Sequence, residues 1–433
     1  MKKNLLYLVL LLSVSGCIET FDIDPEINDS ELALIIEATL TNELKKQKIF
    51  LSRPSDFAIV NVEDSIYDPV VKLRPIPPTV VYESNAMVIV NDDAGNEYRF
   101  SESSPGTYTS DTAFAVEQGI NYELEVVTAD GTGYRSTPES YQGSSQIDDV
   151  YAVRDFNEQG KEGVYIYVDG SSSDPNVKYY RYTYEETYKI IAPEWRKEDF
   201  VLSNYDPCAL PVITYDLDIV ERENEFGKVC YGKQVSADII QNNTLNLQNN
   251  QIVRFPVRFL DRNNFIISHR YSILVKQYVQ SSNAHNFYRI LDSFSSSESV
   301  FSSVQPGVLE GNVRAEGNAD KKVLGFFEVT PVVEKRMYFN YVDLFPNEPL
   351  PDYAIGCFPR SALEAHVSYC FTGLSGGGCP LSIVESVNIN LISYYGINDG
   401  TVGICPGPYV FTFRACGDCT ILGASEVPDF WIE

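Results

Sequence analysis

The sequence predicts a mainly β protein built from tandem immunoglobulin- or fibronectin-like β-sandwiches, with a short helix and a disulfide-rich C-terminal region. Three observations carry this prediction. The 433 residues include 29 tyrosines and 23 phenylalanines but only 3 methionines, and aromatic residues are enriched in strands. Short stretches alternate apolar and polar residues between turn-forming residues, as half-buried strands do. Six of the nine cysteines lie after residue 350, which places the stapled part of the chain at its end.

Residues 1–16 have the pattern of a secretory signal. A basic start precedes an apolar run over residues 5–12, and small residues follow it. Val14-Ser15-Gly16-Cys17 resembles a bacterial lipobox, which implies cleavage before Cys17 and acylation of that residue. The run is shorter than the ~20 apolar residues that a transmembrane helix needs. The alternative is an ordinary secretory signal with a chance cysteine.

An acidic tether, residues 17–30, follows the signal. Its acidic residues are Glu19, Asp22, Asp24 and Glu26. Acidic residues directly after a lipidated cysteine resemble the surface-export signal of Bacteroidota lipoproteins. This resemblance implies a chain held in the outer membrane by lipid on Cys17 and facing the cell surface. A solvated acidic tether without an export role is the alternative.

Turn and strand signals divide the rest of the chain into three regions. Residues 31–142 are predicted to form an N-terminal β-sandwich. Residues 143–280 are predicted to form a second sandwich-like domain with a long insertion at 192–235, and a loop of that length is either functional or a subdomain. Residues 281–433 are predicted to combine a helix, further strands and the cysteine-rich tail.

The helix is predicted from one apolar stripe. Phe287, Ile290, Leu291 and Phe294 recur at helical spacing. Ser282 or Asn283 is expected to be the N-cap, because short polar side chains accept hydrogen bonds from the first turn.

The charge of the chain disfavours nucleic acid as a partner. The formal net charge is −27, and a polyanion repels phosphate backbones. The acidity is interpreted as a solubility feature.

Eight cysteines besides Cys17 are expected to form disulfides, because an even number in an exported chain favours pairing. They are Cys208, Cys230, Cys357, Cys370, Cys379, Cys405, Cys416 and Cys419. Eight cysteines allow 105 pairings, so the connectivity is left open. For Cys416 and Cys419, zinc binding and redox chemistry are the alternatives to a structural role.

No catalytic residue, metal site or cofactor site is predicted. Gly373-Leu374-Ser375-Gly376-Gly377 matches a nucleophile elbow in form, but no helix signal follows it and no histidine follows His366. Asp92, Asp93, Asn96 and Glu97 lack EF-hand spacing and are interpreted as a hairpin turn. A hydrolase remains the least favoured function.

A surface for a glycan or peptide ligand is the candidate binding site. Tyr180, Tyr182, Tyr184 and Trp195 are its predicted residues, since aromatic rings offer a large contact area at low entropic cost. Consecutive residues of a strand point to opposite faces, so only one face can carry such a surface. Cross-strand packing in a core is the alternative reading of these rings.

Several segments in a fixed order resemble one protein family. They are Asp174-Pro175, Tyr179-Tyr180-Arg181-Tyr182, Phe287-Tyr288 with Leu291, Gln305-Pro306-Gly307, Gly311-Asn312-Val313, Val323-Leu324-Gly325-Phe326-Phe327, Cys416-Gly417-Asp418-Cys419-Thr420 and Pro428-Asp429-Phe430-Trp431. This order resembles the Bacteroidota lipoprotein family named domain of unknown function 4249, across about residues 17–433. The resemblance implies an outer-membrane lipoprotein that acts beside a TonB-dependent receptor, and it supplies no catalytic residues.

These observations together predict a non-enzymatic lipoprotein that serves as an accessory or substrate-capture subunit of a TonB-dependent transporter. The alternative is a free-standing glycan-binding adhesin, which an exposed aromatic row on one sheet face would favour.

Overall fold

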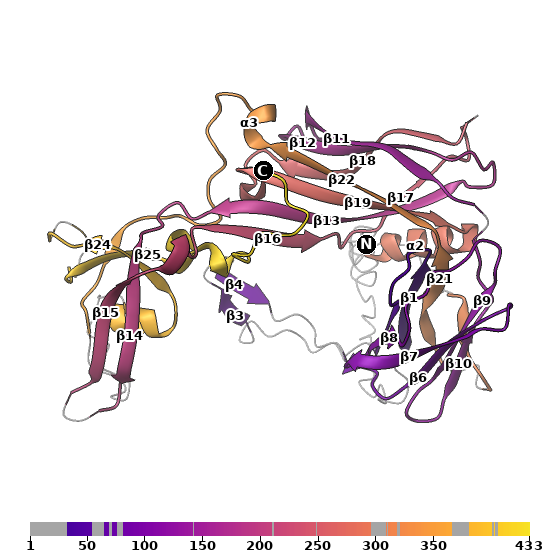
Figure 1. The fold of residues 1–433 in the computed structure, drawn as a ribbon, viewed down its shortest axis with the longest axis horizontal. Coiled ribbons are helices and arrows are strands. Elements are labelled where there is room, and N and C mark those ends of the chain that lie inside the picture. Colours follow the sequence, from indigo (N-terminus) through magenta and orange to yellow (C-terminus); the bar gives the residue numbers. More distant parts are fainter. Residues whose placement is uncertain are drawn as a thin grey trace, which may run out of the picture.

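The described strands group into three bodies: an N-terminal sheet, a two-sheet sandwich and a C-terminal lobe (Figure 1). The computed structural model describes residues 33–53, 65–68, 72–75, 81–141, 143–209, 212–247, 249–295, 309, 311–317, 321–365, 381–400, 402 and 406–433. Strands dominate these residues and the helices are short, so the predicted mainly β class is confirmed.

The N-terminal sheet combines strands from two distant parts of the chain. Its strand order is β20-β10-β9-β6-β7-β8-β2-β1-β21, with β5 beside β2. The strands are β1 (Leu34–Thr41), β2 (Lys48–Arg53), β5 (Val81–Tyr82), β6 (Met87–Asp92), β7 (Glu97–Ser104), β8 (Thr107–Ser110), β9 (Tyr122–Val127), β10 (Gly133–Ser136), β20 (Val313–Ala315) and β21 (Val323–Thr330). β21 returns to pair with β1 in parallel. A separate hairpin pairs β3 (Ser65–Asp68) with β4 (Lys72–Pro75).

The N-terminal sheet curls until its two end strands meet. The Asn312 side chain bridges them, because it donates to the Phe327 carbonyl at 2.8 Å and accepts from the Phe327 amide at 2.8 Å. Asn312 also donates to the Glu139 carboxylate at 3.0 Å. Inside the curl, alternate residues of each strand form one apolar core that includes Leu34, Ile36 and their neighbours.

The sandwich faces a three-stranded sheet with a five-stranded one. The first sheet has the order β11-β12-β18, and the second has the order β16-β13-β19-β22 with β17 beside β13. The strands are β11 (Gln146–Phe156), β12 (Glu162–Ser171), β18 (Gln251–Asp261), β13 (Tyr179–Ile191), β16 (Val229–Val235), β17 (Ile240–Asn243), β19 (Arg270–Gln280) and β22 (Val332–Asn340), with the short helices η4 (Phe265–Ile267) and α3 (Tyr341–Leu344) at one end. One apolar core lies between the two sheets.

Helix α2 (Ser282–Ser295) forms where the apolar stripe predicts a helix. Its N-cap differs from the prediction. The Ser281 hydroxyl accepts from the Ala284 amide at 3.1 Å, so the cap precedes Ser282 and Asn283. The reason is that strand β19 ends at Gln280, so Ser281 lies between the strand and the helix and takes the N-cap position.

The C-terminal lobe joins the predicted insertion to the cysteine-rich tail. The insertion 192–235 contains the hairpin β14–β15, which packs on the tail strands through Phe200, Tyr394 and Phe411. The elements are β14 (Glu198–Asp206), β15 (Thr214–Glu221), η3 (Glu223–Glu225), β23 (Arg360–Ser361), α4 (Ile383–Asn388), β24 (Ile392–Ile397), β25 (Tyr409–Phe413), α5 (Arg414–Gly417) and η5 (Cys419–Ile421). The part of the insertion that precedes β16 is therefore a structured arm of this lobe, whereas β16 itself belongs to the sandwich.

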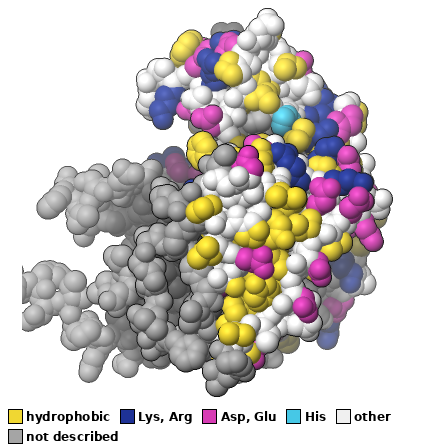
Figure 2. Space-filling view, turned by 90° about the vertical axis from the view of Figure 1, so that its left-hand side faces the viewer, with side chains coloured by type: hydrophobic (Ala, Val, Ile, Leu, Met, Phe, Trp, Pro, Cys, Tyr) yellow, Lys and Arg dark blue, Asp and Glu magenta, His cyan; other side chains and the backbone are white. Residues whose placement is uncertain are grey.

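The C-terminal lobe exposes a band of hydrophobic side chains. Figure 2 looks onto this end of the molecule and shows the band running down its face. Exposed apolar side chains of the lobe include Val201, Val212, Ile219, Val220, Phe358, Leu363, Leu381, Ile389, Ile397 and Ile421. Patches of this kind mark interaction surfaces more often than single exposed apolar residues do.

The segment 281–433 is shared among all three bodies. It supplies β20 and β21 to the N-terminal sheet, β22 to the sandwich and the tail strands to the C-terminal lobe. Within the described residues, no helix combines the length and apolar character that crossing a bilayer requires.

Candidate functional site

An aromatic row lies on the outer face of the β11-β12-β18 sheet. It comprises Tyr151, Tyr167, Tyr165 and Phe259, whose ring centroids follow one another at 5.9, 5.5 and 4.7 Å. The strand register creates the row, because Tyr151 pairs with Tyr167 across β11–β12 and Tyr165 pairs with Phe259 across β12–β18. Three of the rings are half-buried against each other, and the central ring, Tyr167, is 8% exposed.

The alternation along β12 explains why these rings face outward. Val164, Ile166 and Val168 point into the sandwich core, so Tyr165 and Tyr167 must lie on the opposite face. The tyrosines of this strand were not among the predicted binding residues. Their signal was the sequence Tyr165-Ile166-Tyr167-Val168, which places both phenols on one side and both aliphatic residues on the other.

A β-bulge places a cation at the edge of the aromatic row. The register of β12 and β18 shifts near Val168, and Arg254 takes a φ of +53° there. Bulges re-aim side chains and are common beside functional sites. The Arg254 guanidinium lies 4.5 Å from the Tyr167 ring centroid, and its amide donates to Asp169 Oδ1 at 2.6 Å.

Carboxylates complete the edge of the row. The Tyr151 hydroxyl donates to Asp169 at 3.2 Å, and Asp155 accepts from Arg254 at 3.4 Å. Burial and the adjacent Asp169 charge raise the pKa of Tyr151 above its ordinary value. The Arg254 guanidinium covers the Tyr167 ring, so the open apolar surface of the row comes from its three half-buried rings, with hydrogen-bonding groups at the rim.

The aromatic surface predicted on β13 is not formed. Tyr180, Tyr182 and Tyr184 are 0%, 0% and 4% exposed and belong to the sandwich core. They are buried because β13 is an internal strand whose inner face lies against the other sheet. Trp195 is half-buried against the same core, and its indole donates to the Phe226 carbonyl at 3.0 Å. Core packing, the alternative reading, is correct for these tyrosines.

The described cysteines are structural. Disulfides join Cys230 to Cys419 and Cys357 to Cys416, so the two cysteines of the Cys416–Cys419 segment bond to distant partners and not to each other. With both sulfurs in disulfides, neither can ligate zinc as a thiolate. Cys208 is also disulfide-bonded. Cys17, Cys370, Cys379 and Cys405 lie outside the described residues.

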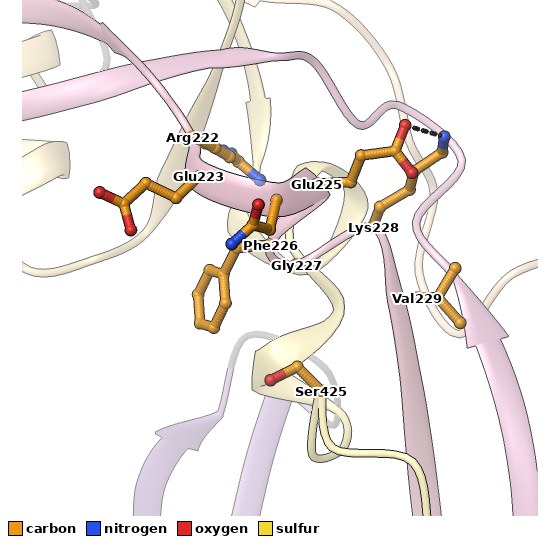
Figure 3. Close-up of a pocket in the computed structure, with 9 residues that line it drawn as sticks. Arg222, Glu223, Glu225, Phe226, Gly227, Lys228, Val229 and Ser425 are labelled. Carbon is orange, nitrogen blue, oxygen red and sulfur yellow. Dashed lines mark hydrogen bonds and ion pairs between the residues drawn. The ribbon is translucent and has the colours of Figure 1, made fainter.

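A cavity of about 650 Å³ lies beside the turn that leads into β16 (Figure 3). Three of the charged side chains that line it, those of Arg222, Glu225 and Lys228, form ion pairs. Glu225 pairs with Lys228 at 2.7 Å, while Arg222 pairs with Asp199 at 2.7 Å and donates to the Gly417 carbonyl at 2.6 Å. Because the Arg222–Gly417 hydrogen bond ties the insertion to the tail, we assign the cavity to the junction between them.

The segment Asp92–Glu97 is a turn. Asp92 accepts from the Asn96 amide at 2.7 Å and from its side chain at 2.8 Å, and the Gly95 amide donates to the Asp92 carbonyl at 3.2 Å, which closes the turn between β6 and β7. Among the described residues, no group of three or more His, Cys, Asp or Glu side chains is arranged to hold a metal ion. Gly373–Gly377 and His366 lie outside the described residues.

A family model described as "Domain of unknown function (DUF4249)" matches residues 20–336. The chain belongs to this family. The matched span contains the aromatic row and the whole N-terminal sheet, and it ends within β22, before the cysteine-rich tail. The sequence predicted a resemblance to this family across about residues 17–433. The family model supports that prediction over the first three quarters of the chain.

Other comparisons add little to what the family match shows. No curated protein matches the chain. One solved structure, titled "Biofilm associated protein - BSP domain", is similar with a TM-score of 0.11 and 8% identity, and the match covers 71% of this chain and 59% of that one.

Proposed function

We propose that this DUF4249 protein is a non-catalytic outer-membrane lipoprotein that captures carbohydrate at the cell surface for a TonB-dependent transporter. The aromatic row Tyr151-Tyr167-Tyr165-Phe259 carries the capture part of the proposal. The C–H faces of a sugar stack on such rings, while Arg254, Asp155 and Asp169 lie where hydroxyl groups need hydrogen-bond partners.

The sequence supports the location of the protein. The lipobox ending at Cys17 and the acidic tether behind it favour a lipid anchor with the folded bodies outside the membrane. Such an anchor keeps a capture protein beside the transporter, which raises the effective concentration of bound ligand there.

The hydrophobic band of the C-terminal lobe supports a protein partner. Phe358 is 67% and Ile397 is 78% exposed. The disulfide Cys230–Cys419 holds this lobe to strand β16 of the sandwich, and the disulfide Cys357–Cys416 braces the lobe itself. A rigidly attached apolar face is suited to docking on another protein.

Co-purification from the native membrane tests the transporter partner. A C-terminally tagged chain is expressed at its native level, outer membranes are solubilised in mild detergent, and the recovered proteins are identified and quantified. A tagged outer-membrane lipoprotein of another family is the matched control. A TonB-dependent barrel in stoichiometric amount, absent from the control, supports the proposal. Recovery of the lipoprotein alone contradicts the accessory role.

The second candidate is a free-standing glycan-binding adhesin. The aromatic row favours it as much as it favours capture, because both functions need carbohydrate recognition. Carbohydrate binding by a chain that recovers no barrel would point to the adhesin.

A further inference from the structure

We propose that a groove on the outer face of the N-terminal sheet binds an anionic amphiphile, with the apolar chain along the sheet and the charged head at a lysine rim. The groove holds about 830 Å³, which lies within the range of small-molecule sites. It is a different surface from the aromatic row, and its ligand is a different class of molecule.

The strand register builds the floor of the groove. β1 pairs with β2 on one side and with β21 on the other, so that Ile35 lies beside Leu324, and Glu37 lies between Phe50 and Phe326. These residues alternate with the core residues of the same strands and must face outward. Phe50 is 45% exposed, so part of this apolar floor remains open.

Helix α2 forms the wall of the groove. The Phe287 ring packs on Phe326 with centroids 5.5 Å apart, which fixes the helix over β21. Tyr288 and Leu291 on the next face of the helix then line the groove, together with Leu309. The result is a trough with an apolar floor and an apolar wall, which suits an acyl chain better than a sugar.

A buried ion pair anchors the end of this trough. Arg181 pairs with Glu328 at 2.7 Å, and its guanidinium lies between the Tyr278 and Tyr288 rings, with centroids at 4.4 and 4.8 Å. Gln280 donates to the other oxygen of Glu328 at 3.0 Å. Glu328 balances the charge of Arg181. Arg181 therefore holds the helix wall in place, and other cations must attract the ligand.

Lysines at the rim supply that attraction. Lys45, Lys46 and Lys48 line the groove, whereas Glu37 is the acidic residue that lines it. Lys45 pairs with Glu43. Within the described part of the chain, Lys46 and Lys48 form no ion pair. A basic rim on a chain of net charge −27 is complementary to an anionic head group.

Titration with dodecanoate tests the proposal. The full mature chain is used with Cys17→Ser, so that neither an acyl group nor detergent competes. Binding is measured by isothermal titration calorimetry, with dodecyl maltoside below its critical micelle concentration as the neutral probe. One dodecanoate per chain is expected. The double variant K46E/K48E should bind dodecanoate roughly tenfold more weakly, and its affinity for the neutral probe should change less.

Matched variants assign the effect to the groove. Lys161 and Lys233 are exposed lysines elsewhere, and K161E/K233E should bind as the unmodified chain does. Phe50→Asp should abolish binding, whereas Phe156→Asp, at a site 62% exposed, should not. Phe50→Ser replaces F50D if thermal unfolding shows that F50D is not folded.

Three results would overturn the proposal. These are the absence of dodecanoate binding, equal affinity in K46E/K48E and K161E/K233E, and unchanged binding in the Phe50 variant. None of them bears on the transporter partner, which co-purification tests separately.

Discussion

At the scale of single residues, one position along a strand decides whether a tyrosine is core or surface. Tyr165 and Tyr180 lie in neighbouring tyrosine-rich strands, and only the first contributes to the aromatic row. Sequence alternation separates the two faces of each strand but does not say which face is covered. The residues that alternate with the tyrosines decide it. In β12 the aliphatic Ile166 marks the core side, whereas in β13 the polar Arg181 and Thr183 mark the outer side and leave the tyrosines between them facing the core.

Glu139 should make stability depend on pH. Burial raises its pKa from the ordinary value near 4.5 to about 7. The folded state therefore binds this proton more tightly than the unfolded state, and stability falls as the pH rises from about 4.5 to about 7. Glu139→Gln removes this fall.

Urea unfolding between pH 4.5 and 7.5 measures the effect. The variant should gain stability relative to the unmodified chain as the pH rises, and the gain should level off above pH 7. A difference that stays constant across this range would show that Glu139 titrates normally.

Breaking the buried Arg181–Glu328 pair should destabilise the fold. Their side chains are 12% and 3% exposed, so Arg181→Met leaves a buried carboxylate uncompensated and should cost about 3 kcal/mol. The double variant R181M/E328M should lose less than R181M. The exposed pair Arg99–Glu97 is the control, and R99M should change stability by less than ~1 kcal/mol. Chemical denaturation measures all three variants, and equal effects of R181M and R99M would refute the burial argument.

At the scale of elements, local patterns were read from the sequence more reliably than pairings. The stripe Phe287–Leu291 predicted α2 because helical spacing is a local property. The parallel pairing of β1 with β21 joins segments about two thirds of the chain apart, since Leu34 pairs with Val323, and no local pattern encodes it. The cysteines behave in the same way, since spacing alone did not indicate that Cys416 and Cys419 bond to separate partners.

Gly325 should be essential for the β1–β21 pairing. Its φ is +132°, and a Cβ at this position would lie 2.0 Å from the Ile36 carbonyl oxygen. Gly325→Ala should therefore destabilise the protein by more than ~2 kcal/mol, because the backbones of the two strands must separate. Gly95 has a φ of +90° with nothing within 4 Å, and Gly95→Ala should cost only about 1 kcal/mol of backbone strain. Thermal unfolding compares the two variants, and equal losses would contradict this role of Gly325.

At the scale of the whole molecule, the chain passes repeatedly from one body to another, which connects the three bodies into one folded unit. Residues 313–340 cross from the N-terminal sheet into the sandwich, and the disulfides hold the C-terminal lobe to β16 and the tail. The sequence predicted the sandwich-like build and the stapled tail. It could not place the aromatic row or the hydrophobic band, since both depend on which faces the bodies leave open.

The hydrophobic band should contribute to partner binding and not to folding. Phe358→Asp with Ile397→Asp should reduce recovery of the co-purifying barrel severalfold without lowering the unfolding temperature, because both side chains are already exposed. Val253→Asp, at a site 66% exposed on β18, is the control and should leave recovery unchanged. Equal recovery from all three proteins would remove the band from the partner interface.

Carbohydrate binding by variants of the aromatic row tests the central claim most directly. The unmodified chain, Tyr165→Ala and the control Tyr82→Ala, whose side chain is 58% exposed, are screened on an array of polysaccharides. We predict that the unmodified chain and Y82A bind the same glycan, and that Y165A binds it about tenfold more weakly because a stacking ring is lost. Equal binding by Y165A and Y82A, or no glycan bound by the unmodified chain, would contradict the assignment of the row as the capture surface.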